Sequence, residues 1–289
     1  MNAYQYVKPP QLTEALRLMR ENPDCHLLAG GTDLLVRMKL GRLQPGLLLD
    51  VSQLPELRTI REEAGLLRIG AAVTHTEICR AEAISRLAPA LAGAASQVGS
   101  PQIRNRGTIG GNVGNASPAG DTLPALLAYG AVVELARYDG RRRRPLKEFF
   151  QGPGRTVLEE GELITGFSLA IRPAGQAAAF EKMGKRKALS ISVVNAAVLI
   201  EMEAGAVVKA RIALGAVAAT VRRMTAAEHH LKGTDLSDGA IAQAAQLVSD
   251  AVNPIDDVRS EAAYRKQIAG VLTRRALETC RRQLNDQRE

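Results

Sequence analysis

The spacing of apolar residues predicts a small mixed lobe at the start of the chain. Helical spacing over residues 12–19 and again from Leu34 to Met38 predicts two short helices. Residues 26–28 read as a strand that leads into a pair of glycines, and residues 47–51 read as the next strand. The order strand, glycine loop, helix and strand predicts a β-α-β lobe over about residues 1–55.

The pattern continues with a strand at residues 66–73 and a helical region from Thr74 to about Val98. Thr74 and Glu77 have the spacing of a capping box, which satisfies free amides at a helix start. Residues 100–121 are dense in Gly, Pro, Ser and Asn, so we expect a long functional loop there. Asp121 then caps a predicted helix that Gly130 ends.

The rest of the chain predicts strands followed by helices. The strands span residues 131–137, 162–170, 192–202 and 206–213, with a hairpin turn at 203–205. The helices span residues 225–231, 237–252 and 260–284, and the last presents an apolar face of Tyr264, Ile268, Val271, Leu272 and Ala276. A composition change at Pro173-Ala174-Gly175 predicts a domain boundary, which gives domains 1–175, with lobes 1–55 and 56–175, and 176–289.

Composition excludes several classes of protein. The chain has 289 residues and three scattered cysteines without a CxxC pair, too few thiolates for a zinc site or an iron–sulfur cluster. No membrane span or secretion signal is evident, and we expect a cytoplasmic protein. The net charge of +8 raises the question of nucleic acid, but aromatic residues are only 3% and no DNA-binding spacing is present. The arginine run 141–144, which follows Asp139-Gly140, favours a solvated strand edge over a phosphate track.

Histidines and catalytic groups give little signal. His229 and His230 are neighbours on a predicted helix and point about a hundred degrees apart, which makes them a poor metal pair. His75 is interpreted as structural, and no Ser/His/Asp or Cys/His arrangement is evident. We therefore predict no metal site and no catalytic residue in this chain.

Two glycine segments carry the candidate chemistry, and we name them by their residues. The first glycine segment is 29–33, Ala-Gly-Gly-Thr-Asp, and the second is 108–112, Thr-Ile-Gly-Gly-Asn. Adjacent glycines at a helix start let backbone amides approach an anion closely. One such pair is also consistent with an ordinary tight turn, but two in one domain favour a grip on a diphosphate. Neither segment is a GxGxxG or GxxxxGK[ST] motif, so the residues alone indicate a phosphate-bearing cofactor.

Several ordered motifs resemble the FAD subunits of the xanthine dehydrogenase and carbon monoxide dehydrogenase family of molybdenum hydroxylases. They are Ala29-Gly30-Gly31-Thr32-Asp33-Leu34-Leu35, residues 104–112, Ser117-Pro118-Ala119-Gly120-Asp121, Phe180-Glu181-Lys182 with residues 186–191, Tyr264-Arg265 and Arg275-Ala276-Leu277. The resemblance covers nearly the whole chain. It implies an α+β fold: a two-lobed FAD-binding domain of the molybdenum hydroxylase (PCMH-like) type, then a C-terminal domain of a small antiparallel sheet plus helices.

The resemblance also assigns site residues. The FAD diphosphate would be wrapped by backbone amides and the side chains of Thr32, Thr108 and Asn112, and Asp121 would lie near the ribityl or phosphate region. Ile164 matches an apolar position beside the isoalloxazine ring, and Lys182 matches a lysine near the polar edge of the flavin. Without the resemblance, Ile164 is equally consistent with strand core and Lys182 with a surface charge. The cofactor-binding set is Leu28, Ala29, Gly30, Gly31, Thr32, Asp33, Thr108, Ile109, Gly110, Gly111, Asn112, Asp121, Ile164 and Lys182.

By the same resemblance, the chain is an electron-transfer subunit. A large molybdenum-cofactor subunit and a small iron–sulfur subunit would send electrons to FAD, which passes them to NAD or another acceptor, in a dimer of heterotrimers. Carbon monoxide dehydrogenases tend to carry His-Ser where this chain has Thr32-Asp33. The resemblance therefore leans toward purine, N-heterocycle or other aromatic substrates. The alternatives are a stand-alone flavin oxidoreductase and a phosphate-binding module without a redox role.

Overall fold

The computed structural model describes residues 4–171, 175–186 and 189–287. Its N-terminal lobe holds a three-stranded parallel sheet in the order β1-β3-β2. The elements are β1 (Gln5–Val7), α1 (Leu12–Glu21), β2 (Cys25–Leu28), α2 (Leu34–Lys39) and β3 (Leu47–Asp50). The predicted β-α-β lobe is confirmed. One face of α1, including Leu12 and Leu16, packs with Leu49 of β3 in a small core, as its apolar spacing requires.

The second lobe is built on a five-stranded antiparallel sheet of order β4-β5-β10-β6-β7. Its strands are β4 (Ile60–Glu63), β5 (Leu66–Gly70), β6 (Val132–Arg137), β7 (Gly140–Pro145) and β10 (Leu163–Ala170), and a separate pair is formed by β8 (Phe150–Gly152) and β9 (Arg155–Thr156). The helices are η1 (Pro55–Leu57), α3 (His75–Arg80), α4 (Glu82–Leu87), α5 (Pro89–Ser96), α6 (Pro101–Arg104), α7 (Ile109–Asn115), α8 (Thr122–Tyr129) and η2 (Leu146–Glu148). The arginine run lies on β7 at the sheet edge, so the strand-edge interpretation is confirmed.

One prediction for this lobe is confirmed and another is wrong. The helical region 74–98 is present as three short helices, because the chain is extended at Ala81 and Pro89 starts a new helix after Ala88. Residues 100–121 are not one long loop but contain α6 and α7. Both helices are capped locally: the Ser100 hydroxyl accepts from the Ile103 amide and the Thr108 hydroxyl from the Gly111 amide. These caps offset the low helix propensity of the glycines.

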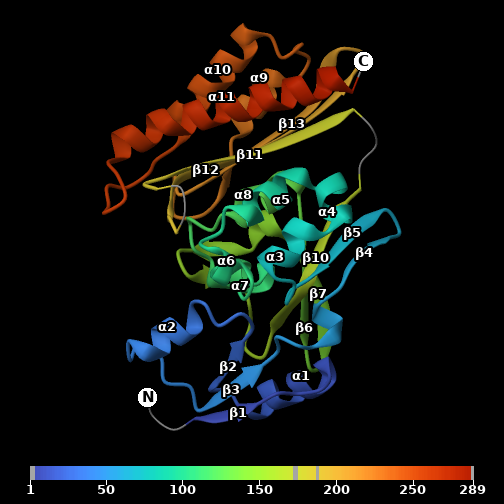
Figure 1. The fold of residues 1–289 in the computed structure, drawn as a ribbon, viewed down its shortest axis with the longest axis vertical. Helices are drawn as coiled ribbons and strands as arrows, with labels where there is room; N and C mark the ends of the chain where they lie inside the picture. The colour runs from blue at the N-terminus through green and yellow to red at the C-terminus, as the bar shows by residue number, and fades with distance from the viewer. Residues whose placement is uncertain (1–3, 172–174, 187–188, 288–289) are drawn as a thin grey trace.

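The C-terminal part is an antiparallel sheet of order β11-β12-β13-β14 with helices on both faces (Figure 1). Its elements are β11 (Gln176–Gly184), β12 (Ser192–Glu203), β13 (Ala206–Gly215), β14 (Arg222–Arg223), α9 (Thr225–Leu231), α10 (Asp238–Ala251) and α11 (Ala262–Asp286). Helices α9, α10 and α11 cover one face, and α5 and α8 of the second lobe contact the other. The hairpin at 203–205 is confirmed, whereas β11 was missed as a strand. Pro173 and Ala174 of the expected boundary lie outside the described residues.

The buried face of α11 is shifted from the predicted one. Tyr264 and Val271 are 41% and 36% exposed, whereas Arg265, Ala269, Leu272 and Ala276 are buried. Arg265 turns inward because its guanidinium forms an ion pair with Asp257 and donates to the Ala216 carbonyl at 3.4 Å. A buried ion pair thus selects the helix face that apolar spacing alone misassigned.

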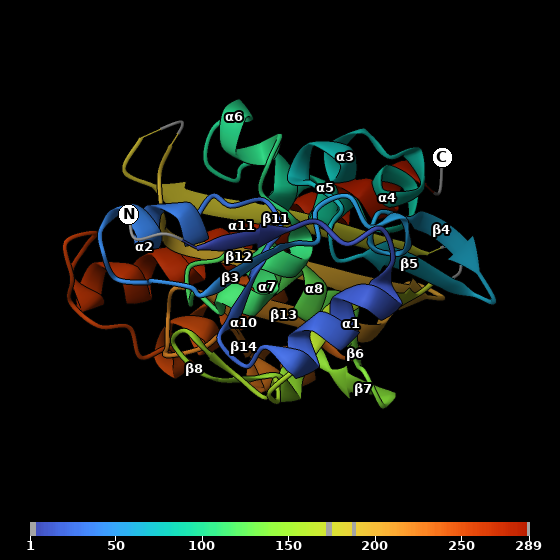
Figure 2. The same ribbon diagram turned by 90° about the horizontal axis from the view of Figure 1, so that it is seen from below.

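The three parts are stacked along the long axis, with the N-terminal lobe at one end and α9–α11 at the other (Figure 1). Figure 2 looks along this stack from the N-terminal lobe and shows α1 and β1 in front of the second lobe. Within the described ranges, none of the helices combines the length and the apolar character that crossing a bilayer requires.

Candidate functional site

The two glycine segments lie on the wall of one cleft between the N-terminal lobe and the second lobe. The cleft has a volume of about 340 Å³. The predicted residues that line it are Ala29, Gly30, Gly31, Thr32, Asp33, Thr108, Gly110, Gly111, Asn112 and Ile164. Leu28 ends β2, with its carbonyl bound to the Val51 amide, and Ile109 is buried in the core of the second lobe. Segments distant in sequence therefore converge on one site.

The first glycine segment offers free backbone donors. Gly30 packs so closely on the second lobe that an added Cβ would lie 2.1 Å from the Arg106 carbonyl oxygen. Gly31 has φ of +75°, which favours glycine. Among the described residues, no acceptor binds the amides of Gly30, Gly31 or Thr32. Three free amides in a turn before a helix are suited to holding a phosphate.

The second glycine segment is the first turn of α7, and its amides are already bound. The amides of Ile109 and Gly110 donate to the carbonyls of Val73 and Ala71 at 3.0 and 2.8 Å. The Gly111 amide donates to the Thr108 hydroxyl at 3.0 Å, and the Asn112 amide to the Thr108 carbonyl at 2.9 Å. This corrects the expectation that backbone amides of 109–112 are available. The segment offers side chains instead, namely the Thr108 hydroxyl proton and the Asn112 amide nitrogen.

The opposite wall of the cleft is apolar and carries Ile164 on β10. A Cβ added to Gly114 of α7 would lie 3.7 Å from Ile164 Cδ1, so this side chain faces the helix that follows the second glycine segment. A β-bulge between Ile164 and Gly166 turns the strand at this point. Leu158 and Leu163 line the same wall. An apolar wall of this kind is suited to packing against one face of a planar aromatic group.

Asp121 and Lys182 form a buried ion pair outside the cleft lining. Lys182 Nζ lies 2.6 Å from Asp121 Oδ2, and the side chains are 7% and 9% exposed. The interpretation of Lys182 as a surface charge is wrong. The Asp121 side chain does not cap α8; its Oδ1 accepts from the Ser192 hydroxyl at 2.6 Å and from Asn195 Nδ2 at 3.0 Å. Three partners from β11 and β12 therefore bind this carboxylate.

A short path connects this ion pair to the cleft. Thr122, which follows Asp121, donates its hydroxyl proton to Asn112 Oδ1 at 2.8 Å. Lys182 also donates to the Gln97 carbonyl at 2.9 Å. Lys182 borders a second cavity of about 370 Å³, which Met183, Arg186 and Leu189 also line. The pair thus lies between the cleft at Asn112 and this second cavity.

Three titratable residues that line the cleft were not predicted as site residues, namely Arg37, His75 and Glu162. Burial, with a smaller contribution from the Arg104 charge, lowers the pKa of His75 to about 4, so its ring is neutral at physiological pH. Its Nδ1 has no hydrogen-bond partner among the described residues. Glu162 stands two residues before Ile164, and this adjacency is the signal that could have indicated it.

The remaining histidines and cysteines form no cluster. His26 is half-buried, with its Nδ1 3.1 Å from the Asp24 carbonyl oxygen, and His230 Nε2 lies 3.2 Å from the Ala240 carbonyl oxygen. Cys25, Cys79 and Cys280 are free thiols. In the part of the chain that the structure describes, no group of three or more His, Cys, Asp or Glu residues could hold a metal ion.

Known proteins share both the sequence and the fold. The family model "FAD binding domain in molybdopterin dehydrogenase" matches residues 2–169, and "CO dehydrogenase flavoprotein C-terminal domain" matches residues 178–280. The carbon monoxide dehydrogenase medium chain of Hydrogenophaga pseudoflava is 35% identical over 95% of this chain and 96% of its own length. The nicotinate dehydrogenase FAD-subunit of Eubacterium barkeri is 34% identical over 92% of each. The structure of quinoline 2-oxidoreductase from Pseudomonas putida 86 has a TM-score of 0.92 and 29% identity, covering 98% of both chains.

The fold and the cleft define an FAD-binding oxidoreductase subunit. A diphosphate cradle of free amides, side-chain donors on α7 and an apolar wall fit the phosphate and ring ends of FAD. The chain belongs to the family of FAD-binding subunits of molybdenum hydroxylases. The predicted family, fold class and cofactor are confirmed.

Proposed function

We propose that this chain holds FAD in the cleft and relays electrons from iron–sulfur clusters of a small partner subunit to NAD or another acceptor. A large partner subunit would carry the molybdenum cofactor and oxidise the substrate. The observation that carries the proposal is the meeting of the two glycine segments at one cleft, where the amides of Gly30, Gly31 and Thr32 have no acceptor among the described residues. Bound there, FAD supplies the two-electron redox chemistry that the side chains of this cleft lack.

The residues of this chain would orient the cofactor and tune its environment. The first glycine segment would hold the diphosphate through its amides and Thr32, and Thr108 and Asn112 would donate from the other side. Ile164 would pack against the ring. The cation of Lys182, fixed by Asp121, would favour electron density on the polar edge of the flavin.

The proposal for the wider assembly is supported by relatives that are named as a medium chain or an FAD-subunit of a dehydrogenase. We infer a heterotrimer with a large and a small subunit, duplicated by two-fold symmetry and located in the cytoplasm. The division into domains 1–175 and 176–289 is supported by the ranges of the two family models. A purine, N-heterocycle or other aromatic substrate is supported by Thr32-Asp33 and by the nicotinate and quinoline relatives. The chain is about as similar to the carbon monoxide dehydrogenase medium chain, at 35% identity, as to the nicotinate dehydrogenase FAD-subunit, at 34%. The Thr32-Asp33 dipeptide is therefore the main support for an aromatic substrate.

FAD binding to the purified chain tests the site. Because the amides grip the diphosphate, FAD should bind at least about tenfold more tightly than riboflavin, which corresponds to 1.4 kcal/mol. Gly30→Ala should abolish binding, since its Cβ would meet the Arg106 carbonyl at 2.1 Å. Gly46→Ala in the same lobe is the control, because its Cβ would have no neighbour closer than 3.9 Å. Equal affinity for FAD and riboflavin, or unaltered binding by Gly30→Ala, would contradict the proposal.

The redox role needs a separate test on the assembled complex. Co-purification of the tagged chain should recover two further subunits together with molybdenum, iron and FAD. A chain that binds FAD but elutes alone, without molybdenum or iron, would favour the stand-alone flavin oxidoreductase.

A further inference from the structure

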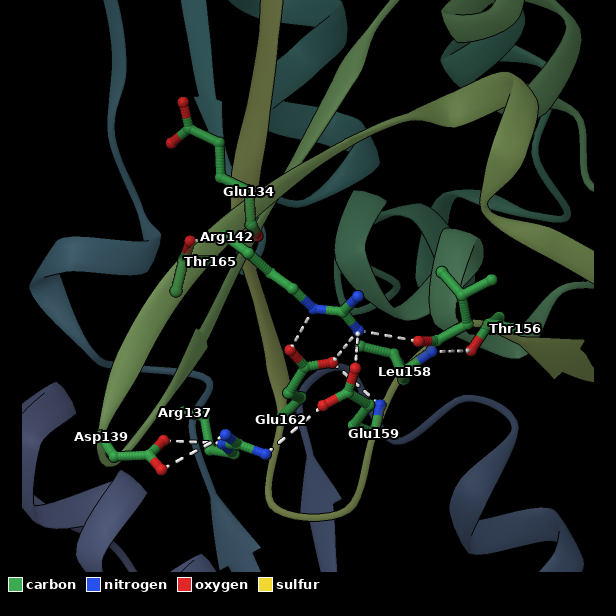
Figure 3. Close-up of polar contacts among 10 residues, drawn as sticks. Glu134, Arg137, Asp139, Arg142, Thr156, Leu158, Glu159, Glu162 and Thr165 are labelled. Atoms are coloured by element: carbon green, nitrogen blue, oxygen red, sulfur yellow. Dashed lines mark hydrogen bonds and ion pairs between the residues drawn. The ribbon is translucent and has the colours of Figure 1, made fainter.

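A carboxylate charge lies on the wall of the cofactor cleft, and one arginine compensates it. The Glu162 side chain is 4% exposed and lines the cleft. Arg142 donates from Nε to Oε1 and from Nη2 to Oε2, both at 2.6 Å, and the Glu159 amide donates to Oε2 at 2.8 Å (Figure 3). This two-point contact between a guanidinium and a carboxylate is the geometry of a strong ion pair.

Arg142 reaches Glu162 from the sheet edge. It is the second arginine in the run 141–144 on β7, and it is partly buried, whereas its neighbours Arg141 and Arg143 are exposed. Its Nη2 also donates to the Val157 carbonyl at 2.9 Å and lies 3.2 Å from Glu159 Oε1. Arg137 and Asp139 continue the network on the solvent side (Figure 3). One member of an apparently solvated arginine run therefore has a specific buried partner.

The pair fixes the segment that forms the apolar wall. Glu162 leads directly into Leu163 and Ile164, and the Arg142 contacts tie residues 157–162 to β7. Just beyond Ile164, the Thr165 hydroxyl donates to the Glu134 carbonyl at 3.1 Å, at the β-bulge (Figure 3). The position of Ile164 is thus set from both sides.

The charge of Glu162 persists at neutral pH. Burial alone would raise the pKa of Glu162, but the hydrogen bonds from Arg142 and the Glu159 amide, together with the Arg142 charge, hold this pKa below its ordinary value. An ionised carboxylate in a cleft of low polarity acts strongly on nearby charge unless a cation compensates it. Arg142 is that cation.

We propose that Arg142 is a positioning and charge-compensating residue for the flavin, which keeps the Glu162 charge from lowering the flavin reduction potential. The inference rests on the proposed function, because it requires flavin in the cleft beside Ile164. Added electrons raise the negative charge of the site, so an uncompensated carboxylate disfavours reduction and an uncompensated guanidinium favours it.

The midpoint potential of the FAD-loaded chain tests this through changes of opposite sign. Arg142→Met should lower the midpoint potential and Glu162→Gln should raise it. Each shift should be about 30 mV, which corresponds to about a tenfold change in the two-electron equilibrium constant. The double variant should return to the wild-type value, and Arg142→Lys, which keeps the charge, should stay near it. Arg143→Met is the matched control on the same strand, because its side chain is 65% exposed and 3.8 Å from Glu134.

The outcomes distinguish an electrostatic effect of the Arg142–Glu162 pair on the flavin from a purely structural role of the pair. Shifts of opposite sign that cancel in the double variant support the proposal. If the midpoint potential shifts in the same direction in both single variants, the pair has only a structural role. The same holds if FAD affinity is lost and the double variant does not recover it. If Arg142→Met does not fold, Glu162→Gln and Arg142→Lys still decide, since an unchanged potential in Glu162→Gln overturns the proposal. A wild-type chain that takes up no FAD overturns the proposed function with it, whereas wild-type uptake with unshifted variants overturns this inference alone.

Discussion

Removing one partner of the buried ion pair between Lys182 and Asp121 should destabilise the chain far more than breaking a surface pair of equal length. Removing one partner of a buried pair typically costs about 3–5 kcal/mol, because the other charge stays desolvated. Asp121 keeps its hydrogen bonds from Ser192 and Asn195, so we expect Lys182→Met to cost about 3 kcal/mol, the lower end of that range. The pair Arg17 and Glu21 has the same 2.6 Å separation, but its side chains are 45% and 43% exposed. Arg17→Met should therefore cost at most about 0.5 kcal/mol.

A double-mutant cycle measures this coupling directly. The variants Lys182→Met, Asp121→Asn and their combination are compared by urea unfolding of the FAD-free chain. We expect a coupling energy of about 2 kcal/mol that changes little between low and high salt, since a buried pair is weakly screened. Additive costs within about 0.5 kcal/mol, or a coupling that salt removes, would refute the reasoning, because the pair would then behave as an exposed one.

Three further outcomes follow from the geometry. Gly114→Ala should stabilise the FAD-free chain by up to about 1 kcal/mol, because alanine has the higher helix propensity. It should also weaken FAD binding, because the added methyl group would enter the cleft 3.7 Å from Ile164 Cδ1. Tighter FAD binding by this variant in a titration would contradict the prediction. The pKa of His75 is lowered to about 4, so the unfolded chain binds the extra proton between about pH 6.5 and 4. Stability should then fall by about 3 kcal/mol as pH drops through that window, and His75→Phe should remove most of this loss in pH-dependent unfolding. Arg265→Met should cost about 2 kcal/mol in urea unfolding, less than a full buried-pair loss because Asp257 keeps Arg259; no measurable cost would show that the burial of Arg265 is energetically neutral.

Local patterns in the sequence predicted the elements whose stability is local. The capping box at Thr74 and Glu77 and the left-handed stop at Gly130 are both present in the structure. The hairpin at 203–205 and the helix over 225–231 also match, because turn residues and apolar spacing act over a few positions. The glycine segments were recognised for the same reason, since closely spaced small residues are legible without tertiary contacts.

Elements that depend on distant partners were misread. Helix α7 contains Gly110, Gly111 and Gly114 and reads as a loop, yet it is helical because Gly110 fits against Ala71 and Thr108 caps its first turn. Its amides are consequently bound, which the sequence did not reveal. In α11, the inward turn of Arg265 depends on Asp257, so apolar spacing alone gave a shifted face.

The sequence by itself determined the family, the cofactor and the two glycine segments, because short motifs of neighbouring residues identify each of them. The tertiary structure alone decided which charges meet. It placed Asp121 against Lys182, Ser192 and Asn195, and Glu162 against Arg142. Such pairings join strands and helices far apart in the chain, and their energies depend on burial and on distances of a few ångströms. No local pattern of residues encodes either quantity.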